Sequence, residues 1–269
     1  MEPRFWDAVN DGNVEEVREI LENHPNVDVN WKNEDWIGHL AAMHRACRYG
    51  HDSIVAILLA HPGINVNVKD SYGHTPFMIA CLNDHTSCAR LMLEDQRAAI
   101  NEPSNNGYTP LRDAAHAGNL EIIKWWVASG REMDLGEPGD SKTDAIGEAR
   151  KNLPWRSGME KDRKTAVVTL LERFKENPEE TRPSVRVELG YQDEMAAAVF
   201  AIVVFVSDGL LRVTQGDEST TPAARFFSIA SQLPMELQMV LCYRVVDSGK
   251  ENISAFDSEA AFRDLSRVV

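Results

Sequence analysis

Two histidines and a cysteine are the side chains in the first half of the chain that are best suited to metal binding or catalysis. His44 and His51 lie seven residues apart with Cys47 between them, and imidazole and thiol groups serve as zinc ligands and as nucleophile–base pairs. The chain's four cysteines show neither a Cys-x-x-Cys pairing nor a histidine at metal-ligand spacing. We therefore expect no metal site and no cofactor, and cysteines that pack in a reducing compartment.

Familiar catalytic motifs are missing from the sequence. It contains neither Gly-x-Ser-x-Gly nor His-Glu-x-x-His. The stretch Gly136–Gly139 lacks the lysine and the following helical pattern of a phosphate-binding loop. Carboxylates are abundant but fall in solvated helix positions and loops, which gives no support to paired acid–base catalysis. We expect a protein that is not an enzyme, with an active site in the C-terminal part as the alternative.

A period of 34 residues organises the first half of the chain. Ala46, Ala80 and Ala114 follow one another at that interval, and Thr75-Pro76 recurs as Thr109-Pro110. Threonine can cap a helix and proline suits its first turn, so each pair predicts a helix start. The asparagines that close the units are Asn30, Asn67 and Asn101. A helix pair of this size cannot bury its apolar face alone, which predicts a stack of units.

These residues resemble the ankyrin repeat family. Gly73–Ala80 and Gly107–Ala115 are similar to its Gly-x-Thr-Pro-Leu-His-x-Ala-Ala signature. The resemblance implies an all-α fold: a solenoid of helix-turn-helix units with projecting loops. The expected units cover about residues 5–30, 35–67, 70–101 and 104–135, with a degenerate one over 140–176. In such a unit, His44 is expected to hydrogen-bond backbone, and Cys47 to fill a small-residue place.

Three departures from the signature stand out. In the second unit, the segment Gly38–His44 has one extra residue and no Thr-Pro, which leaves its turn geometry open. Met78 and Arg112 stand where the signature has histidine. Asp84 stands where a glycine is expected, at a cost of about 1 kcal/mol if its φ is positive.

The C-terminal third follows a different pattern. We expect an ankyrin domain over residues 1–177 and a small helical C-terminal domain over 184–269. Within the latter, residues 185–189 alternate and indicate a short strand. Residues 194–211 indicate a buried helix, with a strand as the alternative because valine and isoleucine are enriched near the end of this stretch. Further helices are expected over residues 222–233, 235–246 and 258–268. The string Leu233–Leu241 is similar to the start of an F-box motif, although a plain proline-started helix explains it too.

The resemblance also implies a binding surface. Ankyrin stacks present a concave face built from loop tips and the first helix of each unit. The positions of this chain that match the family's contact positions are Trp36, Ile37, His39, Arg48, Tyr49, Ser71, Tyr72, His74, Leu82, Asn83, Asn105, Asn106, Tyr108 and His116. Among them the aromatic residues are of most interest, because rings with a polar handle are enriched at interface hot spots. Packing within the stack is the alternative for each ring.

Composition limits the class of partner. The chain has 269 residues and a net charge of −14, which disfavours nucleic acid as the main partner. Its longest apolar run, Ala196–Val206, is about half the roughly 20 residues that span a bilayer, and Met1–Asn10 lacks an apolar signal segment. We expect no membrane segment and a place in the cytoplasm, or the nucleus as well. The expected function is a non-enzymatic adaptor that binds a protein ligand. The alternatives are a substrate receptor of a cullin-type ubiquitin ligase and a C-terminal part that caps the stack.

Overall fold

The computed structural model describes residues 1–34, 38–151 and 158–207, together with residues 230, 238, 239, 241, 242 and 261. The chain divides into two compact units, Met1–Pro183 and Ser184–Val269.

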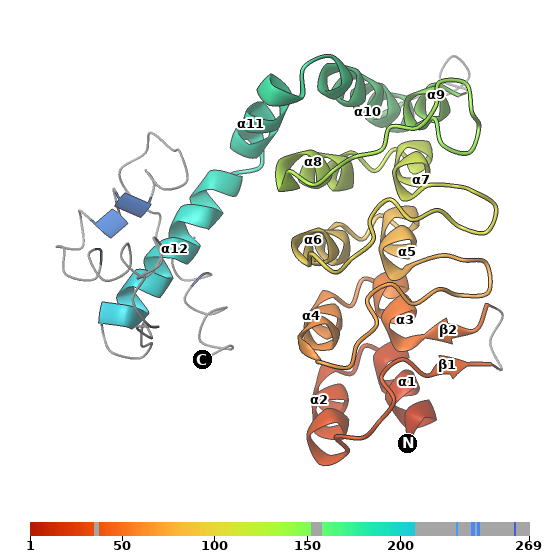
Figure 1. Cartoon of the computed structure of the whole chain (residues 1–269), viewed down its shortest axis with the longest axis vertical. Helices are drawn as coiled ribbons and strands as arrows, with labels where there is room; N and C mark the ends of the chain where they lie inside the picture. Colours follow the sequence, from red (N-terminus) through yellow and green to blue (C-terminus); the bar gives the residue numbers. More distant parts are fainter. Residues whose placement is uncertain are drawn as a thin grey trace, which may run out of the picture. The chain divides into compact units, whose positions relative to one another are not determined.

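The first unit is a stack of helix pairs. The pairs are α1 (Glu2–Asn10) with α2 (Val14–Asn23), α3 (Ala42–Tyr49) with α4 (Asp52–Ala60), α5 (Pro76–Leu82) with α6 (Thr86–Glu94), α7 (Pro110–Ala117) with α8 (Leu120–Ser129), and α9 (Ala145–Arg150) with α10 (Met159–Glu176). The odd-numbered helices pack in one column and the even-numbered ones in another, and the connecting loops project from the odd-numbered column (Figure 1). This arrangement confirms the expected all-α solenoid of ankyrin type.

Capping residues begin and end the inner helices as the repeat pattern predicts. The Thr75 and Thr109 side chains each accept a hydrogen bond of 3.3 Å, from the backbone N–H of Met78 and of Arg112. The proline that follows each threonine occupies the first turn, where no intrahelical N–H is needed. These two helices therefore start because of local sequence alone.

A tight turn joins the two helices in each of the first four pairs. Gly50 has a φ of 73°, and a Cβ built there would lie 2.4 Å from Nδ1 of His85 in the next unit. Asp84 takes the equivalent place with a φ of 60°, so the condition on which its expected cost depended is met. The next unit supplies Asn119 at the place of His85, and its amide donates to the carbonyl of Cys81 at 2.6 Å. Because asparagine is shorter than histidine, the Asn119 side chain leaves room for the Cβ of Asp84.

A short hairpin replaces the Thr-Pro start in the second unit. Strands β1 (Lys32–Asn33) and β2 (Leu40–Ala41) pair antiparallel, with Lys32 opposite Ala41. His39, which directly precedes β2, has a φ of 48°, which few residues other than glycine adopt. In place of a threonine cap, Nδ1 of His44 accepts from the Ala41 N–H at 3.1 Å.

The closing asparagines join each unit to the next. The Asn67 amide donates to the Arg97 carbonyl at 2.7 Å, and its oxygen accepts from the Ala99 N–H at 2.7 Å. Asn30 and Asn101 make the same pair of contacts one unit earlier and one unit later. Each asparagine side chain thus satisfies one backbone N–H and one backbone carbonyl of a loop that lacks regular secondary-structure hydrogen bonds.

The expectation of a strand over residues 185–189 is wrong. Helix α11 (Pro178–Glu188) covers nearly all of that stretch. Val185 is buried while Val187 is 65% exposed, and residues two apart lie on nearly opposite faces of a helix as well as of a strand. Alternation over so few residues therefore could not distinguish the two structures.

Helix α12 (Tyr191–Ser207) agrees with the expected buried helix as far as the described residues extend. Its buried side chains pack with two described residues from later in the chain. The members of this core are Ala196, Ala197, Phe200, Val203, Ala230 and Cys242. The other helices expected in the C-terminal domain lie outside the described residues, as does most of the F-box-like string at 233–241, of which only residues 238, 239 and 241 are described.

Candidate binding face

A hollow lies between the second and third helix pairs, on the side from which the loops project. Its volume is about 290 Å³. The residues that line it are Gly38, Leu40, Arg48, Asp70, Tyr72, His74, Ile79, Leu82 and Asn83. Five of them were expected from the sequence as contact positions: Arg48, Tyr72, His74, Leu82 and Asn83. We call this site the hollow.

Asp70 holds the loop beside the hollow in shape. One oxygen of its carboxylate, Oδ1, accepts from the backbone N–H of Tyr72 at 2.9 Å and of His74 at 2.8 Å. The other oxygen, Oδ2, lies 3.0 Å from Nδ1 of His74. Sequence reasoning missed Asp70. An aspartate three residues before the turn glycine was its signal, because such side chains bond backbone N–H groups just after them.

The charges of this pair support each other. The hydrogen bond to Asp70 raises the pKa of His74, against the effect of partial burial. Burial opposes ionisation of Asp70, but the hydrogen bonds from His74 outweigh it and lower the pKa of that carboxyl. Asp70 and His74 therefore neutralise each other, and neither group offers a free charge to a ligand.

His44 ties this loop to the preceding unit. Its Nδ1 accepts from the Ala41 N–H, so its Nε2 carries the proton and donates to the His74 carbonyl at 3.1 Å. The side chain is buried, and this burial lowers the pKa of His44 to about 4. The expected backbone role for His44 is confirmed, and Cys47 is buried between helices as expected.

Exposed side chains surround the hollow. Tyr72 is 49% exposed and Leu82 is 40% exposed, whereas most large apolar side chains of the stack are buried. Arg48 is exposed at the end of α3, and among the described residues its guanidinium has no ion-pair or hydrogen-bond partner. An apolar wall with one available cation is thus open to a ligand.

Other expected contact residues lie apart from the hollow. His39, Ser71, Asn105 and Asn106 are exposed on the projecting loops. Trp36 and Ile37 lie outside the described residues. Asn105 also helps to fix neighbouring loops, because its backbone N–H donates to the Tyr72 carbonyl at 2.9 Å and its amide to that of Ser71 at 3.1 Å.

Arginine side chains hold two of the expected aromatic rings. The Arg45 guanidinium lies 4.6 Å from the Tyr49 ring centroid and donates to its hydroxyl at 2.9 Å. The Arg112 guanidinium lies 4.5 Å from the Tyr108 ring centroid. Tyr49 nevertheless stays 46% exposed, so packing within the stack leaves part of its ring accessible.

A buried carboxylate joins the fourth and fifth helix pairs. Glu148 accepts from His116 at 2.7 Å and from Lys151 at 2.5 Å, and lies 3.1 Å from the Arg112 guanidinium. Burial opposes its ionisation, but these hydrogen bonds and the Arg112 charge outweigh it and lower the pKa of Glu148. His116, expected as a contact residue, is therefore already engaged. Sequence reasoning missed Glu148, because its partner His116 is 32 positions away.

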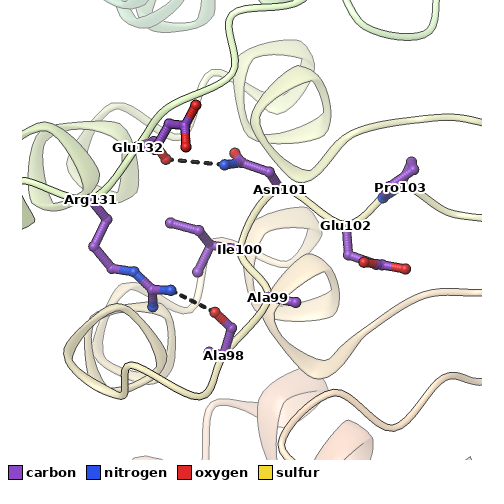
Figure 2. Close-up of a pocket in the computed structure, with 8 residues that line it drawn as sticks. All are labelled: Ala98, Ala99, Ile100, Asn101, Glu102, Pro103, Arg131 and Glu132. Carbon is purple, nitrogen blue, oxygen red and sulfur yellow. Dashed lines mark hydrogen bonds between the residues drawn. The ribbon is translucent and has the colours of Figure 1, made fainter.

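A second, larger depression lies along the loops on residues 98–103 and 131–132, with a volume of about 380 Å³ (Figure 2). Its polar groups are in use between units. Arg131 donates to the Ala98 carbonyl at 2.7 Å, and Asn101 donates to that of Glu132 at 3.1 Å. None of the expected contact residues lines it, so it is the weaker candidate.

Two absences apply to the part of the chain that the structure describes. No group of three His, Cys, Asp or Glu side chains there is placed to hold a metal ion. No helix there is both long and apolar enough to cross a membrane.

Known proteins resemble the first half of this chain. A family model described as ankyrin repeats (3 copies) matches residues 5–70 and 43–136. A tyrosine-protein kinase, HTK16 of Hydra vulgaris, is 33% identical over 125 residues, which are 46% of this chain and 16% of the kinase. The probable E3 ubiquitin-protein ligase XBOS33 of Oryza sativa subsp. japonica is 30% identical over 149 residues, 55% of this chain and 28% of the ligase.

A third relative is the human SH3 and multiple ankyrin repeat domains protein 2, 34% identical over 94 residues, which are 35% of this chain and 5% of that protein. The matched segments thus span less than a third of the length of each of these relatives. What they share with this chain is the repeat array itself. On the repeat signature, the stacked helix pairs and the family model together, residues 5–136 of this chain belong to the ankyrin repeat family.

Proposed function

We propose that this chain is a non-enzymatic adaptor that binds a protein ligand on the face formed by α3, α5, α7 and their projecting loops. Ankyrin repeats are a protein–protein interaction module, and the face follows from their geometry. One observation carries the proposal: five contact positions expected from the sequence line a single hollow.

The make-up of the face supports a protein ligand. It combines exposed tyrosines with an exposed leucine and an arginine, and tyrosine and arginine are enriched among residues that dominate binding energy at interfaces. The net charge of −14 opposes a nucleic-acid phosphate backbone. A protein in the cytoplasm, or in the nucleus as well, is the partner that we propose.

Affinity purification with mass spectrometry tests the proposal on the full-length chain. The double variant Tyr72→Ala/Tyr108→Ala removes two rings from the face and should lose the captured partner, with a melting temperature within a few degrees of the wild type. The matched control is Glu15→Ala/Arg18→Ala, which changes two exposed side chains of the outer helix α2. Capture that survives the tyrosine variant would contradict the proposal.

A second candidate function is that of a substrate receptor of a cullin-type ubiquitin ligase. The name of the rice relative, a probable E3 ubiquitin-protein ligase, favours it, together with the F-box-like string at residues 233–241. A pull-down of cullin-complex adaptors with and without residues 222–269 tests it. Loss of the adaptors on truncation supports this function, and unchanged recovery or their absence from both samples contradicts it.

The division into an ankyrin domain over 1–177 and a helical domain over 184–269 is also part of the proposal. A C-terminal part that merely caps the stack is the alternative, because the end of a solenoid exposes apolar surface. A fragment that ends at residue 177 and unfolds cooperatively in solution would count against a pure capping role.

A further inference from the structure

We infer that the hollow receives a large apolar side chain of the protein ligand, and that Arg48 pairs with a carboxylate beside it on the same ligand. The ligand is thus a segment in which an apolar anchor is followed or preceded by aspartate or glutamate. This inference rests on the proposed function and adds the chemistry of the partner.

The walls of the hollow suit an apolar side chain. Leu40 and Ile79 are nearly fully buried at 3% and 6% exposure, and Tyr72 and Leu82 present accessible apolar surface. A volume of about 290 Å³ holds one large side chain and is too small for a folded element. Covering Leu82 removes apolar surface from water, which favours association.

Charge at the hollow favours a carboxylate. Besides the Tyr72 phenol, three acidic or basic groups line it, and two of them, Asp70 and His74, are paired with each other at 3.0 Å. Arg48 is the third, and within the described residues its guanidinium has no such partner. Its planar fork matches a carboxylate with two parallel hydrogen bonds. A doubly charged phosphate fits less well, because Arg48 supplies a single positive charge.

The position of Arg48 in the repeat shows that this cation is specific to one unit. The equivalent places 34 and 68 residues later hold Leu82 and His116. Leu82 is apolar, and His116 is already bonded to Glu148 at 2.7 Å. Along these helix ends, Arg48 is therefore the cation that remains available, next to the apolar wall. In a chain of net charge −14, it gives an acidic segment a local point of attraction.

Fluorescence polarisation with synthetic peptide pools tests the inference on the full-length chain. Each pool has one fixed central pair between random positions: Leu-Glu, Leu-Gln, Ala-Glu or Leu-phosphoserine. We expect the Leu-Glu pool to bind tightest. Replacing Glu by Gln, or the protein's Arg48→Gln, should each weaken binding by about tenfold, the usual worth of a hydrogen bond between two charged groups. In Arg48→Gln, the Leu-Glu and Leu-Gln pools should bind equally.

Control variants separate the possible failures. Arg18→Gln on the outer helix should bind like the wild type, and thermal melting checks that Arg48→Gln is folded. Equal binding of the Leu-Glu and Leu-Gln pools by the wild type overturns the inference that Arg48 pairs with a carboxylate. Tightest binding of the phosphoserine pool also overturns it and indicates a phosphate ligand instead. Either result leaves the proposed face intact if Tyr72→Ala/Tyr108→Ala abolishes binding. Binding that survives this double variant, or no binding by any pool, overturns the proposed face and the inference with it.

Discussion

Two consecutive loops of the stack have the same backbone and different side-chain supports. In the loop of residues 70–74, the Asp70 N–H donates to the His74 carbonyl at 3.1 Å, and in the loop of residues 104–108 the Ser104 N–H donates to the Tyr108 carbonyl at 2.9 Å. The first loop, which we call the clamped loop, is also held by the Asp70 carboxylate and by His44. The second, the open loop, has Ser104 and Met78 at those two places.

The difference has a clear chemical cause. The Ser104 hydroxyl is buried and has no hydrogen-bond partner among the residues that the structure describes, and the Met78 thioether cannot donate to the Tyr108 carbonyl. Backbone bonds common to both repeats therefore suffice to form the turn. Side-chain clamps are added where the loop borders the hollow, which indicates that a fixed loop matters most there.

The largest expected effect is the loss of the histidine clamp. His44→Ala should lower the free energy of unfolding by about 3 kcal/mol, because it leaves the buried Ala41 N–H and His74 carbonyl without partners and opens a cavity. Urea unfolding at neutral pH measures it. The control is His24→Ala, which changes an exposed histidine and should have little effect. Equal stability of the two variants would show that the clamp is unimportant.

Acid should weaken the same clamp. The pKa of His44 is about 4 in the folded chain against 6.5 for the unfolded one, so the unfolded chain binds the extra proton first. Stability from this residue is complete above about pH 6.5 and should fall by about 3 kcal/mol as the pH drops to about 4. His74, with a raised pKa, acts oppositely: its contribution is present below about pH 6.5 and is lost as the pH rises through its folded pKa.

Unfolding free energies at a series of pH values, for the wild type and His44→Gln, separate the two histidines. Glutamine does not titrate, so the variant should lack the fall between pH 6.5 and 4. If both proteins lose stability equally over that range, another group carries the acid sensitivity.

A smaller effect is expected when the clamped loop is made to resemble the open one. Asp70→Ser should cost about 2 kcal/mol, since it removes a charged acceptor from two backbone N–H groups and the partner of His74. The pKa of His74, followed by NMR titration, should fall toward its ordinary value. A His74 titration that does not move would mean that Asp70 is not the cause of the raised pKa.

The smallest effect is the reverse exchange. Ser104→Asp should raise the free energy of unfolding by about 1 kcal/mol, because a carboxylate there can accept from backbone N–H groups as Asp70 does. Ser71→Asp, at an exposed position of the clamped loop, is the matched control and should change little. Destabilisation by Ser104→Asp would show that the open loop cannot adopt the clamped arrangement.

Local features of the fold could be predicted from the sequence. Thr75 and Thr109 start their helices through bonds to residues three positions on, and the positive φ of Asp84 followed from its place in the repeat. Features that join distant residues could not. Glu148 gains its partners across 32 and 36 positions, and nothing in the local pattern of residues 145–150 indicates that it is buried. The expectation of a strand at 185–189 was wrong because alternation over so short a segment fits a helix as well as a strand.

The candidate site was predictable in part for the same reason. The resemblance to the repeat family marks Arg48, Tyr72 and Leu82 as contact positions, with Arg48 and Leu82 one period apart, and the structure brings them to one hollow. Which contact residues are free depends on long-range pairing: Arg48 has no such partner among the described residues, whereas His116 is bonded to Glu148. That distinction requires coordinates.

Site-specific photocrosslinking tests the central claim, binding at the face that carries the hollow, most directly. A benzophenone amino acid is placed at Leu82 on this face or at Glu15 on the outer helix α2, both exposed positions, in the full-length chain expressed in cells. We predict that light produces a discrete protein adduct from position 82 and none from position 15. An adduct from position 15 alone, or none from either, would contradict binding at this face.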